Sequence, residues 1–314
     1  MNIKKICVLG GSGFVGQHLV SKLCERGYEV RVPYRNINRA KHLTVLPAVS
    51  LVEADIHDPV ALTSLLQGMD AVINLVGILH EHKRGAFQRA HVDLPRKVIE
   101  ACKANGIKRL IHMSAIGVSK DGLSQYQRTK GEGEALVREA HGEHLAVTVF
   151  RPSVIFGAGD KFLNLFAGLL NWTPVFPLGS PLAKMQPVHV GDVAQAMAVS
   201  VNNVATFGES YDLCGPKVYT LWELVEYVAK VKGLHRVVMP LSPGMSSLQA
   251  TVFGLMPIKL LTHDNYLTLK TDAVCHCPFP EVFGIRPVAL EAEAPLFLAP
   301  TAPPLFRRFI SEKR

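Results

Sequence analysis

Residues 4–16, KKICVLGGSGFVG, decide the fold of this chain. An apolar run typical of a buried strand leads into glycines 10, 13 and 16, and a helical pattern continues to about residue 26. These glycines permit a tight turn, a close backbone approach to a pyrophosphate, and close packing of helix on strand. The stretch therefore predicts a dinucleotide site with the phosphates at a helix N-terminus. Its predicted residues are Gly10, Ser12, Gly13, Phe14, Val15 and Gly16.

Short apolar runs alternate with helical patterns through the first half of the chain. A helix is expected after Asp58-Pro59, where an N-cap precedes a proline at the first helical position. Another is expected over residues 92–106, which end in Asn-Gly. This alternation predicts a doubly wound α/β fold with a parallel sheet covered on both faces. The predicted strands are 4–10, 28–35, 49–55, 70–77, 107–115 and 144–157.

The alternation breaks after Gly157. Residues 185–201 are predicted to be a strand and a helix that return to the main sheet, and the rest is broken by prolines. The apolar stretch 246–261 contains Pro257 and is shorter than the roughly 20 residues that a membrane span needs. The predicted domains are a Rossmann domain of residues 1–157 plus 185–215, a smaller substrate or docking lobe of residues 158–184 plus 216–300, and a basic tail of residues 301–314.

Composition and charge are those of a folded protein that binds anions. Hydrophobic residues make up 48% and charged residues 19% of the chain, and the net charge is +8. The positive charge is concentrated in residues 1–50, which suits a phosphate-bearing ligand, and in the last ten residues, which suit an acidic partner or an anionic membrane surface. The interleaved aromatics of a nucleic-acid module are missing, so no nucleic-acid partner is expected. The first apolar run is too short for a secretory signal, which predicts a cytoplasmic protein, with peripheral contact on the inner face of a membrane as an alternative.

The cysteines and histidines predict no metal site. The six cysteines form no CxxC pair, and we interpret them as reduced, mostly buried thiols. CHC at 275–277 lacks a partner cluster. LHEHKRG at 79–85 lacks HExxH spacing and is predicted to be a loop over the substrate mouth, while His189 is predicted to be a strand histidine with satisfied hydrogen bonds.

The end of the second predicted strand favours NADP(H) over NAD(H). An NAD site usually has an acidic residue there, whereas this chain has Tyr34 and Arg35, followed by Arg39. A guanidinium can bind a 2′-phosphate bidentately, so Arg35 is the predicted main contact; a solvated loop arginine is the alternative. Asp55 and Ile56 are placed against the adenine, although Asp55 is explained equally well as a cap or turn residue. Leu75, Val76 and Gly77 are predicted to pass beneath the second ribose.

A tyrosine and a lysine four residues apart begin the sequence YQRTKGEGE at residue 126. On a helix Tyr126 and Lys130 share a face, and a nearby ammonium is expected to lower the phenol pKa of about 10 by roughly 1–3 units. That shift suits general acid–base work. Ser114, at the end of the fifth predicted strand, is the candidate for fixing a substrate oxygen. The alternative for the pair is a solvated helix face.

The motifs GGSGFVG, NLVG, HMSAIG, YQRTK and RPSVIFG occur in the order found in short-chain dehydrogenases/reductases, which the chain resembles. The resemblance implies that Tyr126 is the acid/base, that Lys130 holds the nicotinamide ribose, and that Ser114 orients the substrate. It also implies that Pro152, Val154 and Ile155 line the nicotinamide pocket. VPYRN, VINLVG, PLGS and QPVHVGDVA are similar to an atypical, NAD-dependent epimerase/dehydratase-like subgroup that includes the NADPH-binding accessory subunit of respiratory complex I and bacterial relatives. This similarity extends from residue 1 to roughly residue 290.

Three functions follow from the sequence. The first is an NADP(H)-dependent oxidoreductase that moves a hydride to or from a carbonyl or alcohol carbon of a small or quinone-related molecule. The second is a non-catalytic NADPH-binding module that docks on a respiratory or quinone-related membrane assembly. The third is a nucleotide-sugar epimerase or dehydratase, for which the second lobe offers no evident diphosphate clamp.

Overall fold

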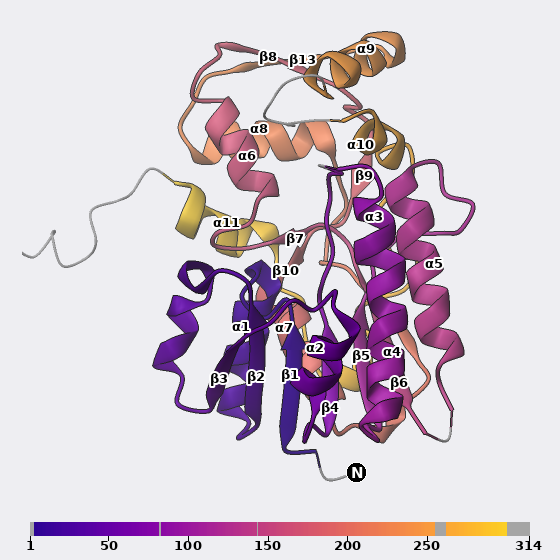
Figure 1. Ribbon diagram of the computed structural model, residues 1–314. Coiled ribbons are helices and arrows are strands. Elements are labelled where there is room, and N and C mark those ends of the chain that lie inside the picture. Colours follow the sequence, from indigo (N-terminus) through magenta and orange to yellow (C-terminus); the bar gives the residue numbers. More distant parts are fainter. Residues whose placement is uncertain (1–2, 82, 143, 255–261, 300–314) are drawn as a thin grey trace, which may run out of the picture.

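The computed structural model describes residues 3–81, 83–142, 144–254 and 262–299. Its centre is a seven-stranded parallel sheet in the order β11-β6-β5-β4-β1-β2-β3 (Figure 1). This confirms the predicted doubly wound α/β fold. The strands are β1 Lys5–Leu9, β2 Glu29–Tyr34, β3 Val49–Glu53, β4 Ala71–Asn74, β5 Arg109–Met113, β6 Ala146–Pro152 and β11 Ser210–Leu213.

Helices cover both faces of this sheet because its inner strands are apolar on both sides; all four residues of β4 are buried. Helices α1 (Phe14–Glu25) and α7 (Val190–Ser200) share one core with β1, β2 and β4. Helices α2 (Pro59–Leu66), α4 (Leu94–Ala104) and α5 (Gln125–Glu139) pack against the other face. The Asp58 carboxylate accepts a hydrogen bond from Val60 N, as expected for the cap of α2.

The remaining short elements of this half connect the strands. They are the 3₁₀ turns η1 Ile37–Arg39, η2 Lys41–Val45 and η4 Val204–Thr206, helix α3 Ala86–Gln88, and the π-helical turn η3 Arg89–Asp93.

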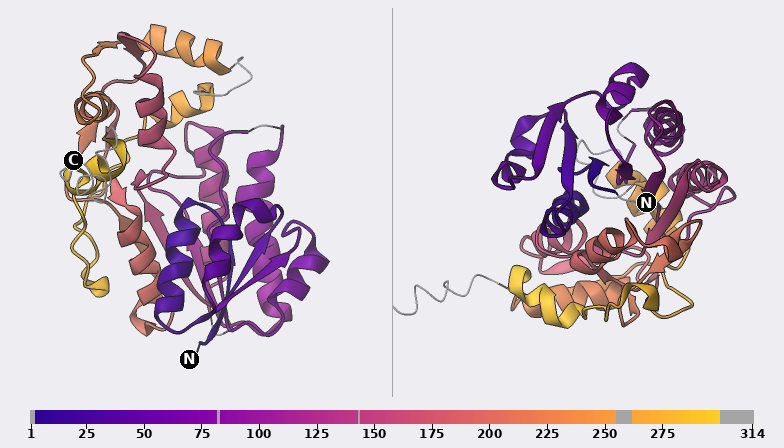
Figure 2. Two further views of the ribbon diagram at one scale, coloured as in Figure 1. Left: turned by 90° about the vertical axis from the view of Figure 1, so that its left-hand side faces the viewer. Right: turned by 90° about the horizontal axis from the view of Figure 1, so that it is seen from below.

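A smaller lobe lies beyond the carboxyl ends of the strands (Figures 1 and 2). It has its own core, to which Phe156, Leu224 and Leu290 contribute. Its elements are β7 Ile155–Phe156, α6 Phe162–Leu169, β8 Val175–Leu178, β9 Lys184–Met185, β10 Val188–His189, β12 Tyr219–Thr220, α8 Leu221–Val231, β13 Val237–Pro240, α9 Pro243–Gly254, α10 His263–Thr268 and α11 Leu290–Leu298. The turn η5 Glu281–Phe283 instead packs on the main sheet, since Phe283 belongs to the core shared with α1 and α7. The exact domain boundaries stay a prediction.

Two strand predictions are corrected. The sixth predicted strand stops at Pro152, and only Ile155 and Phe156 resume as β7. The strand predicted from residue 185 does not join the main sheet: β10 pairs with β7, and the strand that returns is β11, beside β6. Helix α7 of that stretch packs in the core on the same sheet face as α1, and Val188 of β10 also contributes to this core.

A buried arginine joins the amino-terminal end of β5 to the end of α7. The Arg109 guanidinium donates to the carbonyls of Ala146, Ser200 and Val201 and to the hydroxyls of Thr148 and Thr206. Burial lowers the pKa of Arg109 to about 9. Its partners include the last carbonyls of a helix, where a cation is favourable.

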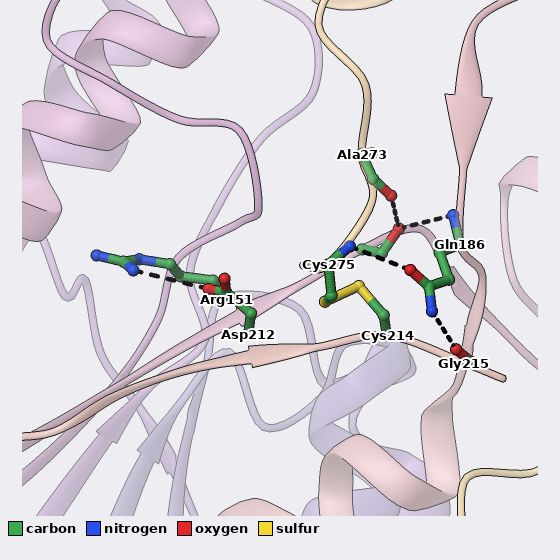
Figure 3. Close-up of a disulfide and its surroundings, with 8 residues drawn as sticks. Arg151, Gln186, Asp212, Cys214, Gly215, Ala273 and Cys275 are labelled. Carbon is green, nitrogen blue, oxygen red and sulfur yellow. Dashed lines mark hydrogen bonds and ion pairs between the residues drawn. A yellow bond between two sulfur atoms is a disulfide. The ribbon is translucent and has the colours of Figure 1, made fainter. Parts of the chain in front are cut away.

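The prediction of reduced thiols is wrong for two of the six cysteines. Cys214, directly after β11, forms a disulfide with Cys275 across 61 residues (Figure 3). Gln186 bridges the two segments beside this bond, since its side chain accepts from Cys275 N at 3.0 Å and donates to Gly215 O at 2.6 Å. Tertiary packing thus brings together two cysteines whose sequence spacing gives no pairing signal. The free cysteines of the described chain are Cys7, Cys24, Cys102 and Cys277.

Among the described residues, no helix is long and apolar enough to cross a membrane. The basic tail and residues 255–261, which end the apolar stretch 246–261, lie outside the described residues. The predictions made for them stay predictions.

Candidate functional site

The loop between β1 and α1 needs glycine at two of its positions, Gly10 for its backbone conformation and Gly16 for its space. Gly10 adopts a φ of +82°, which favours glycine. A Cβ on Gly16 would lie 2.3 Å from the Gly10 carbonyl oxygen, so only glycine allows α1 to start this close to the loop. Gly13 is the N-cap of α1, and the first turn holds no acidic side chain. The first N–H groups of α1 have no intrahelical partner, a geometry suited to an anion. Ser12, Phe14 and Val15 belong to the same turn, and its role in phosphate binding stays a prediction.

The predicted 2′-phosphate residues lie at the carboxyl end of β2. Tyr34 ends the strand half-buried, and Arg35 and Arg39 are exposed on the following turn. Asp55 is a turn residue: its carboxylate accepts from His57 N at 3.0 Å and lies 3.8 Å from the Arg89 guanidinium.

The pKa of Asp55 is lowered, first by its hydrogen bond from the His57 backbone and also by the Arg89 and Arg35 charges. Arg35 is therefore close enough to influence the Asp55 turn. The half-buried Ile56 packs against the apolar core between the sheet and α2.

Lys130 is buried between α5 and the ends of β4 and β5. Its Nζ donates to the Met113 carbonyl at 2.7 Å, and a Cβ on Gly77 would lie 3.3 Å from the same Nζ. Burial lowers the pKa of Lys130 to about 8, opposed by the Glu134 carboxylate one turn further along the helix. The structure thus brings Lys130 and Gly77 together, as the two sequence predictions require. Leu75 and Val76 lead from β4 into the Gly77 turn.

Tyr126 lies in the first turn of α5, packed among rings. Its centroid is 6.1 Å from that of Phe87 and 5.5 Å from that of His91, both edge to face. Burial raises its pKa to about 12. The predicted lowering by Lys130 is therefore wrong, because desolvation dominates at the phenol while the ammonium is hydrogen-bonded to the Met113 carbonyl.

Ser114 follows β5 and is 3% exposed. Its N–H donates to Phe150 O at 2.7 Å, but its hydroxyl has no hydrogen-bond partner within the described part of the chain. A buried hydroxyl without a partner is costly, so this position is suited to a ligand oxygen or an ordered water. Pro152, which ends β6, and Val154 and Ile155, which follow it, lie beside the same sheet edge.

His91 is the residue of this site that sequence reasoning missed. It lies on η3 and is 2% exposed, with Nε2 accepting from Ile78 N at 3.2 Å and Nδ1 lying 3.0 Å from the Thr129 hydroxyl. It links the turn after β4 to the Tyr126 helix. The sequence does contain an indirect signal, since glycines 131 and 133 are unfavourable inside a helix. The structure explains Gly133, because a Cβ there would lie 1.7 Å from the His91 carbonyl oxygen.

Stability in acid is expected to depend on His91. Burial and then Lys130 lower its pKa from 6.5 to about 3. Between these values the unfolded chain binds a proton that the folded chain does not, so the free energy of unfolding falls as pH falls, by up to about 1.4 kcal/mol per pH unit. Above pH 6.5 His91 is neutral in both the folded and the unfolded chain, so this loss of stability is absent there. His91→Gln, which keeps an acceptor for Ile78 N, should give a shallower acid slope in urea unfolding from pH 4 to 6.5.

The matched control is His144→Gln, a change at an exposed histidine. A wild-type slope in both variants would contradict the role given to His91.

Three further predictions concern metal binding, the loop at residues 79–85 and His189. Within the described ranges no group of three His, Cys, Asp or Glu could hold a metal ion. In the 79–85 loop the Glu81 carboxylate accepts from Phe87 N at 3.2 Å, and His82 lies outside the described residues. His189 ends β10 with its ring 5.4 Å from that of Phe156.

A parallel sheet whose order reverses between β1 and β4, with a glycine-rich turn leading into α1, defines a Rossmann-type dinucleotide-binding protein. The sequence profile of the NAD dependent epimerase/dehydratase family matches residues 6–214, and the chain belongs to this family.

Curated relatives agree with the resemblance seen in the sequence and confirm it. The chain is 31% identical over 297 residues to the mitochondrial NADH dehydrogenase [ubiquinone] 1 alpha subcomplex subunit 9 of Rattus norvegicus, covering 91% of this chain and 78% of that one. It is 31% identical over 276 residues to a ceramide reductase of Caulobacter vibrioides, covering 83% and 85%. In fold it is similar to an NADPH-dependent quinone oxidoreductase from Escherichia coli, with a TM-score of 0.74, 21% identity, and coverage of 93% and 99%.

Proposed function

We propose that this protein is an NADP(H)-dependent oxidoreductase that interconverts a carbonyl and an alcohol. The observation that carries the proposal is the Ser114 hydroxyl, buried without a partner at the carboxyl end of β5. Lys130 and Gly77 meet at the same edge of the sheet, where doubly wound folds bind their ligands. The relatives named as reductases support this reading over an epimerase or dehydratase.

The residues of this chain fit an NADP(H) molecule. The side-chain-free turn of Gly10, Gly13 and Gly16 would hold the pyrophosphate, and Arg35 the 2′-phosphate. Lys130 would hold the ribose next to the nicotinamide. When bound, the nicotinamide would supply or accept the hydride.

Tyr126 and Ser114 would both contact the substrate oxygen. The Ser114 hydroxyl donates a hydrogen bond that orients it, and the Tyr126 hydroxyl gives it a proton as the carbonyl becomes an alcohol. A phenol pKa of about 12 keeps Tyr126 protonated at neutral pH. This favours reduction of a carbonyl, since the reverse reaction needs the phenolate.

Deuterium transfer tests the proposal. The protein is incubated with NADPH carrying deuterium at C4, a panel of carbonyl and quinone compounds, and a cell extract, and products are examined by mass spectrometry. Deuterium on the carbinol carbon is the expected result for an aldehyde or ketone; for a quinone, whose added hydrogens lie on oxygen and exchange with water, the expected result is NADPH consumption matched by hydroquinone. NADPH binding without any transfer would contradict the oxidoreductase and favour the second candidate, a module docked on a respiratory assembly, which the similarity to a complex I subunit over 91% of the chain supports.

Preference for NADPH is expected to depend on Arg35. A charge-assisted contact to the 2′-phosphate is worth about 1.5–3 kcal/mol, so Arg35→Ala should weaken NADPH binding by roughly 10–100-fold and leave NADH binding unchanged. Nucleotide fluorescence titration measures both affinities. Arg26→Ala removes an exposed charge at the opposite end of α1 and serves as control. An unchanged ratio of the two affinities in Arg35→Ala would show that Arg35 is only a loop residue.

A further inference from the structure

The start of the Tyr126 helix is capped from the smaller lobe. A helix leaves its first backbone N–H groups without intrahelical partners. In α5 the Ser124 hydroxyl accepts from Gln127 N at 3.1 Å, as part of a capping box. The two amides before it donate to the Asp264 carboxylate, Gln125 N at 2.6 Å and Tyr126 N at 3.2 Å. The backbone of Tyr126 is thus held by a residue 138 positions further along the chain.

The helix that carries Asp264 joins three parts of the molecule. Figure 1 shows α10 at the end of α5 nearest the smaller lobe. The Thr268 hydroxyl donates to the Ser124 hydroxyl at 2.7 Å, and the Asn265 amide donates to the Leu79 carbonyl, two residues beyond Gly77, at 3.2 Å. The Tyr266 hydroxyl donates to Pro243 O at the start of α9. Hydrogen bonds thus join α10 to the first turn of α5, to the turn after β4 and to the start of α9.

We propose that Asp264 is a positioning residue that couples the smaller lobe to the proton donor. The proposal rests on the proposed function. Tyr126 lies in the turn that Asp264 caps, whereas Lys130 lies one turn further on and is held independently by the Met113 carbonyl. Loss of the cap displaces the Tyr126 hydroxyl and leaves Lys130 and the glycine loop in place. The effect falls on turnover and not on nucleotide affinity.

The test compares Asp264→Ala and Asp264→Asn with Asp272→Ala. Asp272 is the matched control because its carboxylate also accepts from a backbone amide, Lys184 N at 3.2 Å, on the same segment but away from α5. Asp264→Ala should lower kcat about 10–100-fold with unchanged NADPH affinity, since a misplacement of about 1 Å can cost 10²-fold. Asp264→Asn keeps one acceptor oxygen and should recover part of the rate. Asp272→Ala should match the wild type.

Hydrogen exchange provides a readout that does not need turnover. The amides of Gln125 and Tyr126 should exchange faster in Asp264→Ala than in Asp272→Ala, with NADPH affinity intact. Wild-type exchange at these amides, a kcat equal to that of Asp272→Ala, or a joint loss of kcat and NADPH affinity would each overturn the proposal. If the wild type reduces no substrate, the proposed function fails, and the exchange measurement alone decides whether Asp264 positions Tyr126.

Discussion

Replacement of Tyr126 by phenylalanine is expected to lower turnover by about 10²–10⁴-fold, the usual contribution of a positioned general acid. The change removes the proton donor and keeps the ring that packs against Phe87 and His91. NADPH affinity should stay within about twofold of the wild type, because Lys130 is held by the Met113 carbonyl and the glycine loop belongs to the start of α1 and not to α5.

Single-turnover NADPH oxidation, monitored by absorbance with the substrate found by deuterium transfer, measures this loss. Tyr211→Phe is the control, since it also removes a hydroxyl, one that donates to the Ala205 carbonyl at 3.3 Å. Equal rates in wild type and Tyr126→Phe would exclude Tyr126 as the acid. The opening of α5 would then serve nucleotide binding alone.

Loss of the Cys214–Cys275 disulfide is expected to lower the free energy of unfolding by about 2–4 kcal/mol. The bond closes a loop of 61 residues, and a cross-link of this length restricts the unfolded chain considerably. Folded-state contacts beside it should survive: Gln186 still bridges Cys275 N and Gly215 O, and the Ser153 hydroxyl still donates to Ala273 O at 2.7 Å. The protein should therefore stay folded but unfold at lower urea concentration.

Urea unfolding of the wild type with and without a phosphine reductant, and of Cys214→Ser, measures this effect. Cys277→Ser is the matched control because Cys277 is an exposed free thiol two residues from the bond. Thiol titration of the denatured, unreduced protein should find four free cysteines. Six free thiols, or a wild-type midpoint insensitive to reductant, would contradict the disulfide.

The site could be predicted from sequence where its chemistry depends on local pattern. The glycine loop, the four-residue spacing of Tyr126 and Lys130, and Ser114 at a strand end are all readable because each is fixed by one strand–turn–helix unit. Asp264 was not readable, and His91 was marked only indirectly, by the glycines at 131 and 133 of the neighbouring helix. Their roles come from hydrogen bonds to Ile78 N and to Tyr126 N, and backbone amides carry no sequence signal.

The sequence by itself determined the α/β class, the glycine-rich turn into the first helix and the four-residue spacing of Tyr126 and Lys130 on one helix, because periodicity and spacing are local properties of a chain. Tertiary structure alone decided that β11 and not the segment at 185 completes the sheet, and that Cys214 meets Cys275. It also decided the direction of the Tyr126 pKa, raised to about 12. Desolvation depends on all the residues packed around a group, and the pairing of distant strands or cysteines depends on which surfaces pack together. Neither can therefore be inferred from a short stretch of sequence.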